Sequence, residues 1–140
     1  MNEQKNLTVI NDQNELDKIV SFTNKTSDSW GFSPELTGEI NLMLEELFIN
    51  TISYGYTDTA VHEIKISFKY ENRLFTIEFS DDGLEFNPLT IPEADTSLDI
   101  MDRKIGGLGM YLIKKLSDTV EYKYENGRNT LIIIKTITVN

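Results

Sequence analysis

Hydrophobic residues in the first half of the chain recur mainly at helical spacing. A short apolar run at residues 7–10 predicts an edge strand, and residues 11–30 carry apolar side chains near helical spacing, followed by a glycine that suits a helix C-cap. Ser33 and Pro34 favour a second helix start, because serine suits the N-cap and proline the first turn. This longer helix is predicted to end at Gly55.

The hydrophobic period changes after the second helix. Residues 64–70 alternate between apolar and polar side chains, which predicts a half-buried strand, and residues 74–80 predict another strand after a tight turn at Glu71-Asn72. Residues 81–106 show no period at all. Because a loop of that length inside a domain is commonly functional, we expect a lid over about residues 84–106.

The end of the chain predicts a short helix and a closing hairpin. Apolar residues at helical spacing mark the helix at 110–116, and residues 120–124 and 130–138 predict two strands around an Asn-Gly turn at 125–127. Strands paired by hairpins, with helices inserted as blocks, predict an α+β fold. We expect a two-layer sandwich with a mainly antiparallel mixed sheet and helices on one face.

Composition limits the kinds of site that the chain can hold. The 140 residues are expected to form a single domain over residues 1–140. The absence of cysteine excludes disulfides and thiolate metal sites, and the single histidine, His62, excludes any site that needs two. No signal-peptide pattern or membrane-length apolar run is present, so a cytoplasmic protein without membrane partners is expected.

The charge of the chain argues against nucleic acid as a partner. A formal net charge of −10, from 23 acidic and 13 basic side chains, repels phosphate backbones at long range. A bound nucleotide remains compatible with this field, because backbone amides and a cation can outweigh it locally. The net charge could also serve only to keep the protein soluble.

The first candidate site lies on the predicted long helix. Glu46 and Asn50 are four residues apart and therefore share a helix face, at the border of the apolar stripe. A carboxylate and an amide oxygen in that position can hold magnesium or accept a proton. A solvated polar pair is the commoner explanation of this spacing when it is taken alone.

Three further groups of residues suggest ligand binding. Asp81 follows a predicted strand and can accept a hydrogen bond from an exocyclic amine, while Gly83 lets a ring approach the backbone. The cluster Gly106-Gly107-Leu108-Gly109 precedes a helix, where free amides and the helix dipole suit phosphate, although it matches neither a Walker A motif nor the dinucleotide fingerprint. Thr130 could complete a polar contact. Taken singly, each group also has an ordinary structural explanation.

The order of these groups resembles the GHKL ATPase domain of histidine kinases and of related chaperones and topoisomerases. The stretches 46–50, 81–88 and 106–110 look like the three nucleotide-binding boxes of that family, and the resemblance spans about residues 36–136. It is strongest for the anti-sigma factor serine/threonine kinases, whose short domain stands alone.

The resemblance implies a protein that binds ATP and Mg²⁺. Asn50 would coordinate the metal ion, and Glu46 would be the base that activates the attacking hydroxyl group or water. Asp81 would bind the adenine amino group, with Gly83 beneath the ring and Thr130 in support.

The resemblance also implies a phosphate-binding loop before the short helix. Its expected members are Gly106, Gly107, Leu108 and Gly109. The last two glycines would donate amides to the phosphates, and the first would set the hinge of the lid. By position, Arg103 or Lys104 would reach the γ-phosphate.

Some positions depart from the pattern of histidine kinases. Glu85 stands where those proteins carry a second glycine, as is common in the anti-sigma branch, and Ile105 replaces the first glycine of the longer phosphate motif. Ser53 and Tyr54 occupy positions where relatives often have a basic residue, which removes one expected phosphate contact. The chain has no phosphoacceptor-histidine helix pair.

Two functions fit this resemblance. The leading hypothesis is a serine/threonine protein kinase that phosphorylates a small STAS-type anti-sigma antagonist, with a sigma factor as a further partner. The alternative is a nucleotide-gated binding module that sequesters a sigma factor or related regulator without significant turnover. An ATPase subunit of a larger signalling assembly is less favoured. Relatives tend to dimerise, and residues 7–22 are the expected surface for a homodimer.

Overall fold

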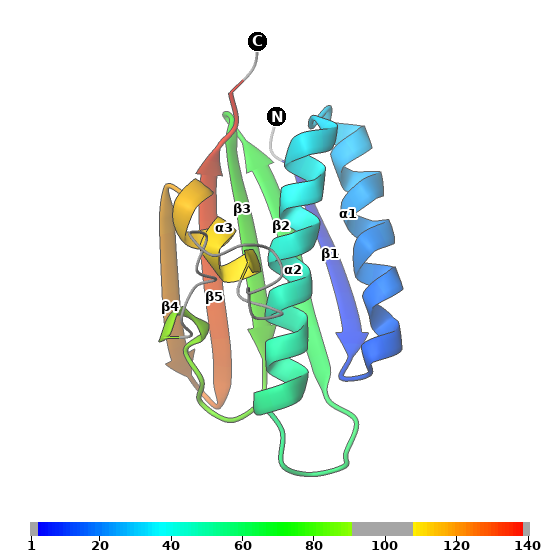
Figure 1. The fold of residues 1–140 in the computed structure, drawn as a ribbon, viewed down its shortest axis with the longest axis vertical. Helices are drawn as coiled ribbons and strands as arrows, with labels where there is room; N and C mark the ends of the chain where they lie inside the picture. Colours follow the sequence, from blue (N-terminus) through cyan, green and yellow to red (C-terminus); the bar gives the residue numbers. More distant parts are fainter. Residues whose placement is uncertain (1–2, 91–107, 139–140) are drawn as a thin grey trace, which may run out of the picture.

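The computed structural model describes residues 3–90 and 108–138 as helices, strands and their connections (Figure 1). In chain order the elements are β1 (Glu3–Ile10), η1 (Gln13–Glu15), α1 (Leu16–Trp30), α2 (Pro34–Tyr54), β2 (Glu63–Glu71), β3 (Leu74–Asp81), η2 (Pro88–Thr90), α3 (Leu108–Leu116), β4 (Thr119–Glu125) and β5 (Arg128–Thr136).

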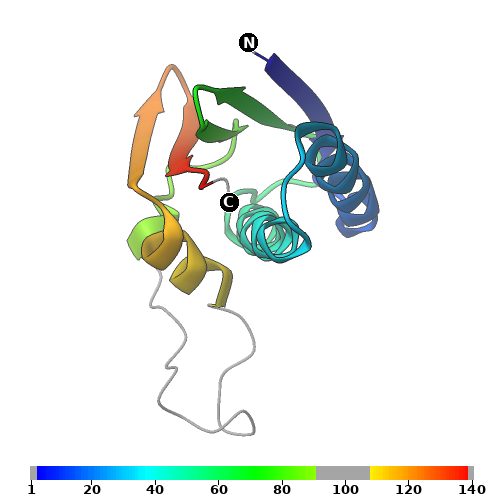
Figure 2. The same ribbon diagram turned by 90° about the horizontal axis from the view of Figure 1, so that it is seen from above.

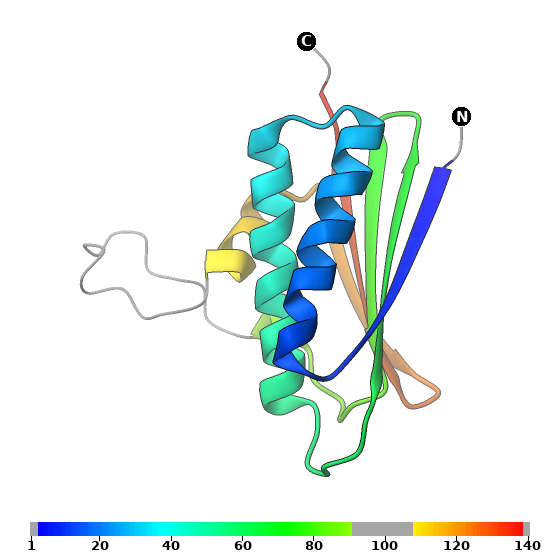
Figure 3. The ribbon, with the colours of Figure 1, turned by 90° about the vertical axis from the view of Figure 1, so that its right-hand side faces the viewer.

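The strands form one five-stranded sheet in the order β1-β2-β3-β5-β4, and each of the four pairings is antiparallel. All three α-helices lie on the same face of this sheet, as the views along and across the strands show (Figures 2 and 3). The expected two-layer α+β sandwich is therefore confirmed, and β1 is the edge strand that the sequence predicts. The expectation of a mixed sheet is wrong for the described strands, because every neighbouring pair among them is antiparallel, with hairpins joining β2 to β3 and β4 to β5.

The core lies between the sheet and the helices, with α2 as the largest contributor among them. Alternate residues of β2 and β3 are buried on the side that faces the helices, as their period of two predicts. On α2, the buried apolar residues recur at threes and fours, so one helix face packs on the sheet. This packing fixes the end of β3 beside the second half of α2, where the candidate site lies.

Local signals set the helix ends. Ser33 caps α2 by accepting a hydrogen bond from the Leu36 amide at 3.1 Å, and Gly31 adopts the left-handed conformation with φ of 73° at the end of α1. The first helix occupies only part of the stretch 11–30 in which the sequence places apolar residues near helical spacing. The Asp12 side chain accepts from the Asn14 amide and caps the short η1 turn instead, so that α1 begins at residue 16.

The two hairpin turns use residues with positive φ. Asn72 and Arg73 form the first turn, with φ of 51° and 67°, one residue later than predicted. Asn126 and Gly127 form the second turn, as their sequence predicts. Of the expected lid, residues 84–90 are described and contain the η2 turn, while residues 91–107 lie outside the described residues. Within the described ranges, no helix has both the length and the apolarity needed to cross a membrane.

Candidate functional site

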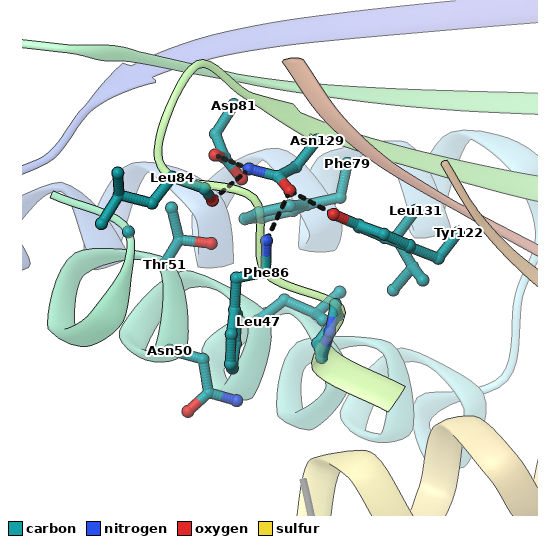
Figure 4. A pocket seen from close by; sticks show the side chains of 12 residues that line it. Leu47, Asn50, Thr51, Phe79, Asp81, Leu84, Phe86, Tyr122, Asn129 and Leu131 are labelled. Atoms are coloured by element: carbon teal, nitrogen blue, oxygen red, sulfur yellow. Dashed lines mark hydrogen bonds between the residues drawn. The ribbon is translucent and has the colours of Figure 1, made fainter. Parts of the chain in front are cut away.

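A pocket lies at one end of the sandwich, where the second half of α2 meets the ends of β3 and the β4-β5 hairpin (Figure 4). Its polar residues are Asn50, Thr51, Asp81, Tyr122 and Asn129, and apolar residues make up most of the remaining wall. The segment after β3 contributes Leu84, Phe86 and Pro88. The enclosed volume is only about 20 Å³, roughly the space of one water molecule.

Asp81 is a buried carboxylate at the end of β3, with 6% of its surface exposed. Its Oδ1 atom accepts hydrogen bonds from the Gly83 amide at 2.9 Å and from Asn129 Nδ2 at 3.0 Å. Burial raises the pKa of the Asp81 carboxyl above its ordinary value, while these two hydrogen bonds act in the opposite direction. A buried acceptor of this kind suits recognition of an amine.

Asn129 holds the segment after β3 against the sheet. Its Nδ2 donates to Asp81 and also to the Leu84 carbonyl at 2.8 Å, and its Oδ1 accepts from the Phe86 amide at 2.9 Å and from the Tyr122 hydroxyl (Figure 4). The amide group of Asn129 is therefore bonded at both ends, which fixes its orientation.

Thr130, which is expected from the sequence to support the ligand, is not among the residues that line this pocket. In the ladder between β3 and β5, Asn129 pairs with Asp81, whereas Thr130 pairs with Ser80 and lies within 3.5 Å of its hydroxyl oxygen. Because neighbouring residues of a strand point to opposite faces, Thr130 faces away from the helices. Asn129 lies two residues before the core residue Leu131, so the alternation of the strand places both side chains on the same face. This alternation is the signal in the sequence that identifies Asn129.

Glu46 and Asn50 lie one turn apart on α2, as their spacing predicts. Asn50 is buried and lines the pocket. Its Nδ2 atom has no hydrogen-bond partner among residues 3–90 and 108–138, and a buried amide in this state calls for a polar ligand. Glu46 is half-buried and lies beside the start of α3, outside the pocket wall.

Two of the predicted site glycines serve close backbone packing. A Cβ atom on Gly83 would lie 2.6 Å from the Gly55 carbonyl oxygen, and one on Gly109 would lie 2.4 Å from the Cβ of Glu46. Only glycine allows these approaches. Leu108 is the first residue of α3 and is exposed.

The remaining predicted phosphate-loop residues lie outside the described residues. These are Arg103, Lys104, Gly106 and Gly107. Their roles stay predictions, as does the amide donation expected from Gly109.

The residues around the pocket fit a magnesium ion that is held mainly by the phosphates of a bound ligand. Within the described ranges, no three acidic or histidine side chains converge to form a metal cage. Mg²⁺ is commonly bound by one or two protein oxygens together with phosphates and water molecules. The side-chain oxygen of Asn50, a buried residue of the pocket wall, is a ligand of that kind. Its Nδ2 atom, unpartnered within the described residues, is a hydrogen-bond donor and suits an anionic oxygen of the ligand, not the metal ion.

Comparisons with known proteins agree with this geometry. The family model of the histidine kinase-like ATPase domain matches residues 9–135. Two curated serine-protein kinases named RsbW, from Listeria monocytogenes and Bacillus thuringiensis, are 30% identical over 102 residues and 31% identical over 107 residues. The matches cover 69% and 73% of this chain, but only 64% and 66% of the two relatives.

A solved structure shares the fold at low sequence identity. The histidine kinase AdeS of Acinetobacter baumannii superposes with a TM-score of 0.52 over 95% of this chain and 68% of the other, at 16% identity. This likeness concerns the fold alone. The resemblance inferred from the three sequence boxes is confirmed, and the chain belongs to the histidine kinase-like ATPase domain family.

Proposed function

We propose that the chain is an ATP- and Mg²⁺-binding serine/threonine protein kinase of the anti-sigma factor type. The observation that carries this proposal is the meeting of Asp81, Asn129 and Asn50 at one pocket between α2 and the sheet. The buried Asp81 carboxylate can accept from the adenine amino group. The buried amide of Asn50 has an oxygen that can bind a phosphate-bound cation and an Nδ2 atom, unpartnered in the described part of the chain, that can donate to a phosphate oxygen.

Asp81 would accept the adenine amino group. Within the described residues, the hydrogen bonds from the Gly83 amide and from Asn129 both go to Oδ1 of this carboxylate, so we assign Oδ2 to the ligand. Asn129, in place of Thr130, would support the carboxylate from the neighbouring strand. Gly83 would keep the loop close to Gly55 and so shape the floor of the pocket.

Asn50 would hold Mg²⁺ through its amide oxygen, and the amides of Gly107 and Gly109 would bind the phosphates. When bound, the ion would neutralise negative charge on the phosphates. Figure 4 shows the side chain of Asn50 extending from α2 away from Asp81 and Asn129, so it would hold the phosphate chain at a distance from the adenine ring.

Glu46 would act as the general base. Its carboxylate would take the proton of the acceptor serine or threonine hydroxyl as that oxygen bonds to the γ-phosphorus and the bond to the β-phosphate oxygen breaks, which leaves ADP. Its half-buried position one turn before Asn50 supports this role, because it places the base beside the proposed phosphate site.

Binding requires the segment after β3 to shift. The pocket volume of about 20 Å³ is far below the several hundred Å³ of a typical ligand site, and the side chains of Leu84, Phe86 and Pro88 line it. The Phe86 ring packs against Tyr54 with centroids 5.5 Å apart. Movement of this segment away from α2 would open the space for the base.

The proposed acceptor is a small STAS-type antagonist protein, with a sigma factor as a second partner. Similarity to serine-protein kinases over most of this chain supports a protein hydroxyl group as acceptor. The experiment is incubation of the chain with Mg-ATP and a candidate antagonist, followed by detection of phosphoserine or phosphothreonine by mass spectrometry.

A matched pair of variants assigns the base. Glu46→Gln should keep nucleotide binding but lower phosphoryl transfer by at least about 100-fold, the scale of general-base loss. Glu45→Gln changes the neighbouring exposed carboxylate and should transfer at the wild-type rate. Equal transfer by Glu46→Gln and the wild type would contradict the role of Glu46.

The nucleotide-gated binding module remains the second candidate. Leu84 in the pocket wall is 52% exposed, and Tyr54, which packs against Phe86 of that wall, is 59% exposed. A shift of the segment after β3 would therefore change an apolar surface. A stoichiometric complex with a sigma factor or antagonist that forms with Mg-ATP, without phosphate transfer, would favour this module over the kinase.

A further inference from the structure

The connection between α2 and β2, residues 55–62, lies directly against the loop that follows β3. The Leu84 amide donates to the Gly55 carbonyl at 2.7 Å, and Gly83 packs on the same carbonyl. Since Asp81 precedes this loop, the position of the connection bears on the geometry of the pocket.

The His62 ring lies between two carboxylates. Its Nε2 atom is 2.8 Å from Asp58 Oδ1, within the connection, and its Nδ1 atom is 3.3 Å from Asp82 Oδ2, in the loop after β3. The Tyr56 ring stacks on the imidazole, with centroids 4.2 Å apart and an angle of 14°, and its hydroxyl contacts Asp82 at 3.4 Å.

The backbone of His62 is fixed from the opposite side by Asn11. The His62 amide donates to Asn11 Oδ1 at 2.9 Å, the Asn11 amide donates to the His62 carbonyl at 3.1 Å, and Asn11 Nδ2 donates to the Ala60 carbonyl at 3.2 Å. The ring is therefore presented to Asp82 from an anchored position and links two loops that are 20 residues apart in sequence.

The contacts of the His62 ring with Asp58 and Asp82 depend on the protonation state of the imidazole. A neutral imidazole carries one N–H group, whereas the imidazolium carries two. Ionised carboxylates only accept hydrogen bonds. The ring can therefore donate to both Asp58 and Asp82 only when His62 is protonated, and loss of the proton removes one of the two bonds.

We propose that His62 is a positioning residue for the nucleotide pocket: its protonated ring ties residues 55–62 to Asp82 and so holds the Asp81-Asp82-Gly83 loop in its binding geometry. This inference rests on the proposed nucleotide site. It predicts that part of the nucleotide affinity is lost as His62 becomes neutral.

The groups around the ring set the direction of the pH dependence. Asp58 and Asp82 raise the pKa of His62 above its ordinary value. Burial, together with Asp81 and Asp82, raises the pKa of Tyr56, which therefore stays a neutral phenol, while Arg128 acts in the opposite direction. The contribution of His62 is full below the ordinary pKa of histidine and is lost as the pH rises through its raised value.

The experiment compares dissociation constants of Mg-ADP for the wild type and His62→Gln from about pH 5.5 to 8.5, at saturating magnesium. Titration of the ligand itself affects both proteins equally, so the ratio of the two dissociation constants reports the contribution of His62 alone. We expect His62→Gln to bind about two- to five-fold more weakly at the acid end, the scale of exposed ion pairs, and equally at the alkaline end.

A second variant tests the link between charge and proton. Asp58→Asn keeps a hydrogen-bonding group in an exposed position but removes one carboxylate, so the pH midpoint of the ratio should move to lower pH. Thermal unfolding at each pH checks that the variants are folded. A ratio that does not change with pH, while the wild type binds, overturns this inference alone. Absence of binding by the wild type at every pH overturns the proposed nucleotide site as well.

Discussion

Gly109 lies so close to Glu46 that a Cβ atom placed on the glycine would be 2.4 Å from the Cβ of the glutamate. The same atom would be 2.6 Å from the Leu42 carbonyl oxygen. The first turn of α3 therefore packs against the backbone of α2 at the position of the proposed base. The glycine is needed for this approach whether or not its amide binds phosphate.

Substitution of Gly109 should separate these two helices. In Gly109→Ala, the new methyl group meets backbone as well as a side-chain Cβ, so α3 must move, and we expect a loss of about 1–3 kcal/mol in the free energy of unfolding. Urea denaturation measures this change.

Gly38→Ala is the matched control for that experiment. Gly38 lies on α2 with nothing within 4 Å of an added Cβ. Alanine is the better helix former by about 0.5–1 kcal/mol, so this variant should be more stable than the wild type. Unchanged stability of Gly109→Ala would contradict the tight contact between α3 and α2.

The pocket role of Asn129, in contrast to Thr130, gives a second prediction. Asn129→Ala removes donors and acceptors that Asp81, Leu84 and Phe86 use, so it should lower the free energy of unfolding by about 1–3 kcal/mol and weaken nucleotide binding. Thr130→Val keeps the shape of a residue on the opposite face and should leave nucleotide affinity unchanged. Calorimetric titration of both variants decides which residue supports the pocket.

The raised pKa of Asp81 predicts that this carboxyl group, which would bind the adenine, lowers the stability of the fold as it ionises. The folded state holds the proton of this carboxyl more tightly than the unfolded state does, so its contribution to stability is full at acid pH and is lost as the pH rises through the raised value. Asp81→Asn does not titrate, and its amide oxygen can accept the same two hydrogen bonds.

The variant should therefore gain stability relative to the wild type between acid and neutral pH. Parallel denaturation series of Asp81→Asn and the wild type across that range measure the difference. A difference that stays constant with pH would show that burial of this carboxylate carries no cost.

Asn50 supplies a prediction about the metal ion. Asn50→Ala removes the proposed protein oxygen but leaves Asp81 and its partners in place. We expect Mg-ATP affinity to fall by about tenfold or more while metal-free adenosine binds as it does to the wild type. A variant that retains full magnesium dependence would place the ion on other residues.

Most of the fold can be predicted from the sequence because its helices, strands and turns are signalled by residues close together in the chain. Alternation in β2 and β3, the Ser33 cap and the Asn126-Gly127 turn each depend on near neighbours. The start of α1 does not follow from the hydrophobic period alone, because the Asp12 side chain accepts a hydrogen bond from the backbone amide two residues later and caps the short η1 turn.

The candidate site was predicted less completely, because its contacts are long-range. The choice between Asn129 and Thr130 depends on the register of β5 against β3, which brings together residues 48 apart. The parity of Asn129 with the core residue Leu131 carried that information in the sequence. Gly83 packs on Gly55, and Gly109 packs on Glu46. These contacts depend on how separate elements approach each other, and one amino-acid sequence carries no signal for that approach.

The nucleotide pocket is tested most directly by calorimetric titration of the chain with ATP, with and without magnesium, for the wild type and Asp81→Asn. We predict micromolar, magnesium-dependent binding by the wild type and its loss in the variant, which stays folded. Absence of binding by the wild type, or equal binding by Asp81→Asn, would contradict the nucleotide site.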